Sequence, residues 1–306
     1  MIKLIIGLIL LAAPFLLAAL FKDKKRGFIY IFFFLIVFHT FLALSTQFFG
    51  IFYYSVILGA NLLAVFLLLA WSLKNKEKFQ FSFQPVKIDW FIFIVAIISV
   101  LSLYQIHYNY TGKFNMVNDA LYQYHDAQNM KYVYPYFSDE WYAVSLSKEA
   151  IDSNSLPLKN PFNNSFFINP EIVFHSFIAE IALFLGLDLL TQYTLLSIFI
   201  NTLLILLAYL FLRFSNVSKF ASAVASLSIL YITSASNLPG IWNLIPFTMG
   251  IILTLIGFCF MAMGKKRFPI LAAIFAVLFY PPLIIFSATG LAVYFFNYLK
   301  TNGRNN

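Results

Sequence analysis

Charged residues are scarce in this chain. Only 10% of its 306 residues are Asp, Glu, Lys or Arg, whereas a soluble globular domain carries about 25%. The one cysteine, Cys259, permits no internal disulfide and suggests no metal cluster. Internal repeats and low-complexity tracts are also absent. The shortage of charge excludes an ordinary soluble domain.

Long apolar runs make up most of the chain instead. Hydrophobic residues account for 61% of it, and several runs approach or exceed the roughly 20 residues needed to cross a bilayer. The sequence therefore predicts an all-α fold, a polytopic transmembrane bundle of about nine or ten helices. We expect an N-terminal three-helix segment at 1–89 and a core at 90–306. The predicted helices are 2–21, 28–45, 51–73, 90–106, 172–190, 192–213, 219–236, 243–263, 268–281 and 283–299.

Basic residues cluster in three short connectors, KDKKR at 22–26, KNKEK at 74–78 and KKR at 265–267. Lys and Arg in short loops favour the cytoplasmic side of a membrane. The net charge of +8 therefore indicates membrane orientation and not a nucleic-acid partner. With these connectors inside, the polar segment 107–171 becomes one large extracytoplasmic loop of a multi-pass protein of the cell membrane.

The segment 172–190 does not fit a strict alternation of inward and outward helices. It would have to begin and end outside, and it is the most polar of the apolar segments. Two interpretations remain open. The segment is either a re-entrant or interfacial helix, or a full span that places Arg213 and Lys219 outside, because the preference of basic residues for the inside is a bias and not a law.

The loop 107–171 concentrates acidic and aromatic residues. It holds seven of the twelve acidic residues and many Tyr, Phe and Trp side chains, which disordered segments lack. A loop this long with no clear strand pattern is typical of a functional segment. Its aromatic side chains fit either an aromatic belt at the headgroup level or a platform for the apolar faces of a sugar.

The stretch that begins at Ser138 predicts a helix within this loop. Ser138 can cap a helix that starts at Asp139, and the helix dipole favours the ionised forms of Asp139 and Glu140 in the first turn. The residues DSNSLP at 152–157 end the helix, since they prefer turns and include Pro157. The two acids are either ordinary helix starters on a solvated surface or part of a site.

Three sequence motifs of this region are similar to motifs of a known family. DEWYA at 139–143, SLPLKNPF at 155–162 and NPEIVFH at 169–175 together resemble the membrane glycosyltransferases of the C fold class. That class includes dolichyl-phosphate-mannose protein mannosyltransferases and lipid A aminoarabinose transferases. The resemblance covers 90–300. It implies transfer of a sugar from a polyprenyl phosphate to a hydroxyl of a glycan, lipid or protein acceptor on the outer face.

The resemblance also implies roles for residues of the loop. Family members use an acidic loop residue as general base, and Asp139 matches that position, with Asp126 of YHDAQ as the alternative acid. Such a base must lie within about 3 Å of the proton it accepts. Trp141 and Tyr142 would contact the sugar. Lys159 either meets the leaving phosphate or is an ordinary solvated lysine.

A divalent cation is the expected cofactor. The carboxylates of Asp139 and Glu140, together with a donor phosphate, are hard oxygen ligands that suit Mg²⁺ or Mn²⁺. In the absence of a metal, Glu140 would contact the substrate or support the fold, and a lysine could replace the cation at the phosphate.

Two histidines lie in apolar segments. Polar groups there are costly and usually face a cavity or a partner. We interpret His175 either as a substrate ligand or as a satisfied packing residue. Glu180 follows it by five residues, a spacing that places the two on different faces of a helix. His39, in the middle of a predicted helix, is expected to form a hydrogen bond with a neighbouring helix.

Two rival functions remain beside the enzyme. One is a transporter or flippase for a lipid-linked or amphipathic solute, with the loop as a lid. The other is a subunit that binds lipid-linked sugar without chemistry. Transporters usually show paired halves and intramembrane charges near the midplane. Because the sequence shows neither clearly, it favours the glycosyltransferase.

Overall fold

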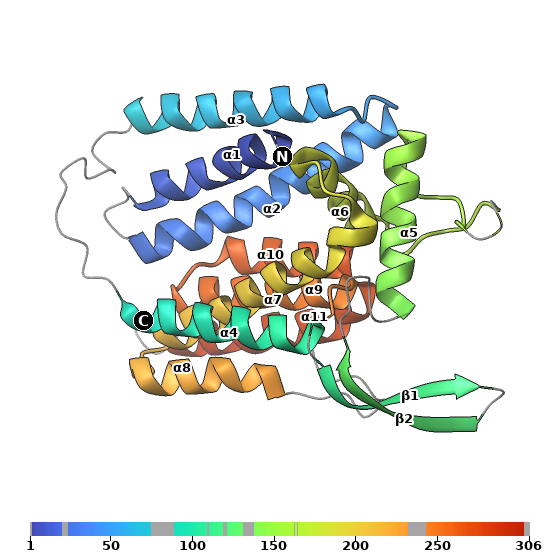
Figure 1. Ribbon diagram of the computed structural model, residues 1–306. Coiled ribbons are helices and arrows are strands. Elements are labelled where there is room, and N and C mark those ends of the chain that lie inside the picture. Colours follow the sequence, from blue (N-terminus) through green and yellow to red (C-terminus); the bar gives the residue numbers. More distant parts are fainter. Residues whose placement is uncertain are drawn as a thin grey trace.

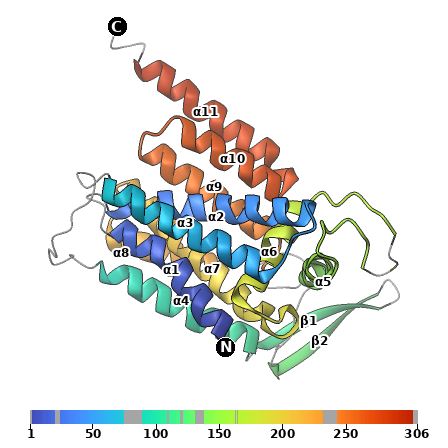
Figure 2. The same ribbon diagram turned by 90° about the horizontal axis from the view of Figure 1, so that it is seen from above.

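The computed structural model describes residues 2–19, 24–74, 89–108, 110–118, 121–130, 138–161, 163, 165–231 and 243–302. Its long helices lie side by side, and one helix and a hairpin lie at one end of them (Figures 1 and 2). The helices are α1 (Ile2–Ala19), α2 (Lys24–Phe48), α3 (Tyr54–Lys74), α4 (Trp90–Tyr108), α5 (Ser138–Ser153), α6 (Ile172–Leu185), α7 (Leu189–Phe214), α8 (Lys219–Leu227), α9 (Pro246–Ala262), α10 (Arg267–Phe279) and α11 (Ile284–Asn302). Short 3₁₀ turns, η2 (Ser228–Tyr231) and η3 (Pro281–Leu283), follow α8 and α10.

Apolar composition explains the long helices. Four of the described helices are long and apolar enough to cross a membrane, and they span Arg26–Phe48, Tyr54–Lys74, Trp90–Tyr108 and Leu189–Phe214. Each predicted apolar helix has a counterpart in the structure. Most ends are shifted by only a few residues, and residues 232–236 of the predicted helix 219–236 lie outside the described part of the chain. The prediction of apolar helices is therefore confirmed, and four of the described ones have the length of a membrane span.

The predicted helix 172–190 is wrong in its extent. The helix ends at Leu185 because Gly186 takes a left-handed conformation with φ of 66°, which glycine adopts without a steric cost. A new helix, α7, then begins under the cap of Asp188, whose carboxylate accepts a hydrogen bond from Leu190 N at 3.2 Å. The first helix, α6, is left with 14 residues, and it is among the apolar helices shorter than a membrane span.

The loop contains a hairpin that the sequence analysis did not predict. Strand β1 (Tyr110–Asn118) pairs in antiparallel fashion with β2 (Leu121–Met130). The register places Asp126 opposite Lys113 and His125 opposite Phe114. The hairpin extends from the end of the bundle beside α5 (Figure 1), so the alternative acid Asp126 belongs to a strand and not to a helix.

Helix α5 begins at Ser138, one residue before the predicted start, and ends at Ser153. The next residue, Asn154, has a positive φ of 52°, which confirms the helix end predicted from the turn-forming residues there. Ala143, Leu146 and Ala150 are all fully buried. Their spacing places them on one face of the helix, and this face packs against α6.

The N-terminal helices pack directly onto the rest of the bundle. Phe33 of α2 lies 5.5 Å from the ring of Phe260 in α9 and 6.1 Å from that of Phe275 in α10, both edge-to-face. Such aromatic pairs contribute about 0.5–1.5 kcal/mol beyond the area they bury. The same helix packs along α6, so α2 joins the three N-terminal helices to the core.

Basic residues gather at the end of the bundle where α2, α4 and α8 begin, on the left of Figure 1. There, Asp89 accepts a hydrogen bond from the hydroxyl of Tyr209 at 3.0 Å, and its carboxylate lies 3.8 Å from the ammonium of Lys219. Lys265, in the turn between α9 and α10, lies 6.0 Å from the ring centroid of Tyr30. We call this the basic end, and the opposite end, which carries α5 and the hairpin, the α5 end.

Helix α6 lies in the half of the molecule nearest α5 in both views (Figures 1 and 2). Its C-terminal end is close to the start of α1, because a methyl group added at Gly186 would lie 2.9 Å from Lys3 Cβ. The ammonium of Lys3 lies 4.5 Å from the ring centroid of Tyr54, the first residue of α3. The chain therefore enters and leaves α6 without reaching the basic end.

Candidate active site

The two acids at the start of α5 point in different directions. Asp139 is exposed, whereas Glu140 is 1% exposed. Glu140 Oε1 accepts a hydrogen bond from the backbone N–H of Leu244 at 2.9 Å, just before α9. The buried hydroxyl of Tyr193 in α7 donates to the carbonyl of the same residue, Leu244. Both backbone polar groups of Leu244 are therefore held by side chains, and Glu140 fixes the start of α5 to the start of α9.

The turn before α6 is ordered by Asn169. Its side-chain nitrogen donates to the carbonyl of Pro157 at 3.2 Å and lies 3.1 Å from His175 Nδ1. Its side-chain oxygen accepts from Glu171 N at 3.0 Å. Because Asn169 is itself buried, it connects the segment after α5 to the first turn of α6. One side chain thus sets the position of the residues that begin α6.

His175 is 1% exposed and lies between α5 and α6. Its ring meets the ring of Tyr142 edge-to-face, with centroids 6.1 Å apart. Its backbone carbonyl accepts a hydrogen bond from the hydroxyl of Ser147 at 3.0 Å. Of the two interpretations of this histidine, these contacts support the packing role. A direct role as a substrate ligand stays a prediction.

Glu171 joins the candidate site, although the sequence analysis treated it only as one of several acids. The carboxyl is half-buried. Burial raises its pKa, and the negative charge of Asp139 raises it further. Burial also raises the pKa of the Tyr142 hydroxyl, and the charge of Glu171 adds to that effect. Asp139, Tyr142 and Glu171 therefore form one electrostatic cluster at the α5 end.

The other predicted substrate-binding residues lie at the surface near this cluster or outside the described side chains. Trp141 is 40% exposed, and it follows the two acids on α5. Lys159 is exposed and pairs its backbone with Phe166 in a short antiparallel bridge. In the described part of the chain, no ion pair involves Lys159. For Asp126, the structure describes only the backbone pairing with Lys113 in the hairpin.

Of the three acids Asp139, Glu140 and Glu171, only Asp139 and Glu171 reach the protein surface at the starts of α5 and α6. Within the described residues, no group of three or more His, Cys, Asp or Glu side chains is placed to hold a metal ion. Glu140 is buried against Leu244, and Asp139 is exposed. A divalent cation bound by Asp139 would draw its remaining ligands from Glu171, from water and from a donor phosphate.

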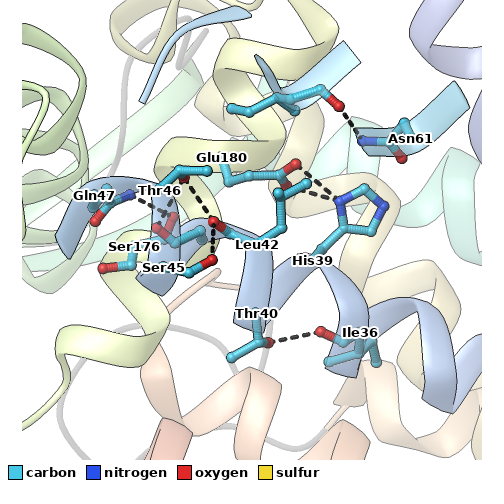
Figure 3. Close-up of polar contacts among 12 residues, drawn as sticks. Ile36, His39, Thr40, Leu42, Ser45, Thr46, Gln47, Asn61, Ser176 and Glu180 are labelled. Carbon is cyan, nitrogen blue, oxygen red and sulfur yellow. Dashed lines mark hydrogen bonds and ion pairs between the residues drawn. The ribbon is translucent and has the colours of Figure 1, made fainter. Parts of the chain in front are cut away.

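The expected hydrogen bond of His39 is confirmed (Figure 3). Its Nδ1 lies 2.9 Å from Oε2 of Glu180 across the interface between α2 and α6. His175 and Glu180 face different elements, as their spacing predicted, because His175 contacts α5 and Glu180 contacts α2.

Comparison of the chain with protein-family models, with curated proteins and with solved structures found no match. The resemblance to the membrane glycosyltransferases therefore rests on the motif residues at 139–143, 155–162 and 169–175.

Proposed function

We propose that the chain is an integral-membrane glycosyltransferase that moves a sugar from a polyprenyl phosphate to an acceptor hydroxyl. One observation carries the proposal. The exposed carboxylate of Asp139 and the half-buried carboxyl of Glu171 lie within electrostatic reach of each other at the start of two helices, at the end of the bundle opposite the basic end. A site there lies where a membrane-bound donor and a water-side acceptor can both reach it.

The proposed topology places the basic end in the cytoplasm and the α5 end outside. Basic residues prefer the cytoplasmic side, and α6 enters and leaves at the α5 end. With α6 as a re-entrant or interfacial helix, the polytopic bundle alternates inward and outward without exception. Arg213 and Lys219 then lie inside, with the other basic residues. The hairpin, α5 and the turn before α6 form the large extracytoplasmic loop of this multi-pass membrane protein.

In the proposed reaction, Asp139 accepts the proton of the acceptor hydroxyl. The acceptor oxygen bonds to the anomeric carbon of the sugar as the bond from that carbon to the phosphate oxygen breaks, and the lipid phosphate leaves with the electron pair. A positioned base contributes about 10²–10⁴-fold to such a rate. Asp139 suits this role because it is exposed. Glu171, with its raised pKa, keeps a proton more readily than an ordinary carboxyl group and can donate a hydrogen bond to the substrate.

The experiment is a transfer assay with membranes that contain the protein and labelled polyprenyl-phosphate sugars. We expect label to appear in an acceptor with wild-type protein and not with Asp139→Asn. Asp152→Asn is the matched control, because Asp152 is an exposed acid of the same helix that pairs with Lys148. Absence of transfer with every sugar donor tested would contradict the enzyme, and binding of the donor without transfer would favour the non-catalytic subunit.

One observation favours a transporter or flippase as a second candidate. The sequence shows no clear intramembrane charge pair, but the structure brings His39 and Glu180 together between two apolar helices. Ionisable pairs of this kind occur in transport proteins. Movement of a fluorescent lipid-linked sugar across proteoliposomes, without any change in its covalent structure, would distinguish this candidate from the enzyme.

A further inference from the structure

His39 and Glu180 are the most deeply buried ionisable pair in the described part of the chain (Figure 3). Their exposed fractions are 1% and 0%. His39 Nδ1 lies 3.0 Å from Oε1 and 2.9 Å from Oε2 of Glu180. The rings of Phe38 and Phe184 lie 5.3 and 5.8 Å from the imidazole. A charge in such surroundings is costly, and in membrane proteins such groups mark the pathways of ions or protons.

The geometry of the pair leaves one ring nitrogen for a second proton. When Nδ1 donates to the carboxylate of Glu180, the other nitrogen of His39, Nε2, carries either a lone pair or a proton. Nε2 is buried and has no hydrogen-bond partner among the described residues. The pair has a net charge of −1 when Nε2 is bare and no net charge when Nε2 is protonated. Because an isolated charge is costly in an apolar interior, a proton at Nε2 stabilises the contact.

Further buried polar atoms lie along the same interface. Gln47 Nε2 donates to the backbone carbonyl of Ser176 at 3.3 Å. Gln47 Oε1 and Ser176 Oγ are buried, and neither has a hydrogen-bond partner in the described structure. Ser176 precedes Glu180 by one turn, so the two share a face of α6. Buried polar atoms that the protein leaves unpaired are common binding places for ordered water.

These atoms form a line from the pair toward the α5 end. Gln47 lies in the last turn of α2, and His39 lies about two turns earlier on the same helix. Ser176 lies in the first turns of α6, beside α5. Water bound at Gln47 and Ser176 would therefore connect His39 and Glu180 with the side of the protein that carries the candidate active site.

The other ionisable groups on the surrounding helices do not contact the pair. Lys3 of α1 lies over the ring of Tyr54 of α3, and Cys259 of α9 is a buried, free thiol. Lys74 and Arg267 stand at the ends of α3 and α10. On α5, the buried acid is bonded to the start of α9. In the described structure, no hydrogen bond or ion pair links either partner of the pair to any of these groups.

We propose that His39 and Glu180 form a proton-binding site in the bundle, which exchanges one proton at His39 Nε2 with water from the α5 end. Glu180 holds the ring by accepting from Nδ1, as the carboxylate partners of proton-carrying histidines do. The proton comes from water and returns to water, and no bond between heavy atoms changes. This site is separate from the proposed sugar transfer, so neither proposal depends on the other.

The test uses the full chain in lipid bilayers with ¹⁵N-labelled histidine. The chain has four histidines, so His39→Gln assigns the signal of interest. We expect the Nε2 resonance of His39 to show both a protonated and an unprotonated nitrogen, in proportions that follow the pH of the buffer. Nδ1 should remain protonated throughout. A His39 signal in the wild-type protein that keeps one state at every pH at which the protein stays folded would overturn the proposal.

Two variants test the parts of the site. Glu180→Gln keeps the shape of the side chain but removes its charge, so it should abolish the Nε2 transition. An unchanged transition would show that the charge of Glu180 does not govern proton binding at His39 Nε2. Gln47→Leu should slow exchange of the Nε2 proton with deuterated water. Ser72→Ala, at a buried serine near the basic end of α3, is the control. Equal exchange rates in the two variants would refute entry from the α5 end.

Discussion

Replacement of Glu140 should destabilise the protein because its carboxylate is the acceptor for a buried N–H. Leu244 is fully buried, so its N–H cannot turn to water when Glu140→Ala removes the acceptor at 2.9 Å. A hydrogen bond to a charged group contributes about 1.5–3 kcal/mol. For a free-energy loss of about 2 kcal/mol, the midpoint of thermal unfolding should fall by about 4–8 °C, given a shift of about 2–4 °C per kcal/mol for chains of about 150–250 residues.

The conservative variant separates the hydrogen bond from the charge. Glu140→Gln keeps a side-chain oxygen that can accept from Leu244, so its midpoint should fall by about half as much or less. Asp152→Asn is the control, since the exposed pair of Asp152 with Lys148, at 3.1 Å, is worth at most about 0.5 kcal/mol. The order of midpoints should therefore be Asp152→Asn, Glu140→Gln and Glu140→Ala, from highest to lowest.

The single cysteine provides the assay. Cys259 is fully buried and free, so a thiol-reactive dye becomes fluorescent only as the protein unfolds in detergent. The transition of each variant is read from this one site at equal protein concentration. A Glu140→Ala midpoint equal to that of wild type would refute the argument that this carboxylate holds α5 to α9. Equal losses for Glu140→Ala and Glu140→Gln would assign the effect to charge and not to the hydrogen bond.

Four further predictions follow from the candidate site and the proposed topology. Asp139→Asn should lower the transfer rate by about 10²–10⁴-fold with little change in thermal midpoint; an active Asp139→Asn beside an inactive Asp126→Asn would place the base on the hairpin. Glu171 has a raised pKa, so folding favours its protonated form. The stabilisation from this form is fully present below the carboxyl pKa of the unfolded chain, and it is lost as the pH rises through the pKa of Glu171 in the folded protein. Glu171→Gln should therefore raise the thermal midpoint at neutral pH, by an amount that shrinks in acid, and a lower midpoint at neutral pH would contradict this sign. A cysteine at Asn154 should react with an impermeant thiol reagent on intact cells and one at Lys76 should not; the reverse pattern would invert the topology. Exhaustive chelation should abolish transfer until Mg²⁺ or Mn²⁺ is restored, and full activity after chelation would exclude a metal.

The apolar helices could be predicted from the sequence because their signal is composition over a long window. Length and hydropathy alone identify the long spans, such as α7. The break between α6 and α7 was predicted, but five residues too late, because the residues on both sides of Gly186 remain apolar. A single left-handed glycine and an aspartate cap two residues later end one helix and begin another. Hydropathy averaged over a window does not detect a change of two residues.

The hairpin was missed for a different reason. A half-buried strand alternates apolar and polar residues, but polar and aromatic residues take thirteen of the nineteen positions of β1 and β2. With no alternation and no Asn-Gly or Asp-Gly turn between the strands, local sequence gives no strand signal. The pairing joins residues across a two-residue connection at 119–120 and depends on contacts that composition does not encode.

The candidate site was predicted in part. The position of Asp139 in the first turn of α5 follows from local helix rules, and the structure agrees. The burial of Glu140 does not follow from them, because its partner, Leu244, is 104 residues away. Glu171 was overlooked as a site residue for the same reason, since its link to Asp139 arises only when α5 packs on α6. The one available signal was its place directly after Asn-Pro at the start of a helix.

The contact between His39 and Glu180 has a consequence for how the chain is made. The two residues are separated by 141 positions, and at a synthesis rate of about 5–20 residues per second the carboxylate leaves the ribosome about 7–28 seconds after the imidazole. During that interval α2 holds a histidine and a glutamine whose partners on α6 do not yet exist. Apolar helices enter a bilayer readily, but a polar side chain in them lowers the tendency to insert. Newly made α2 therefore depends on α1 and α3, or on the insertion machinery, until the middle of the chain arrives, and a truncation before residue 172 should leave α2 prone to degradation.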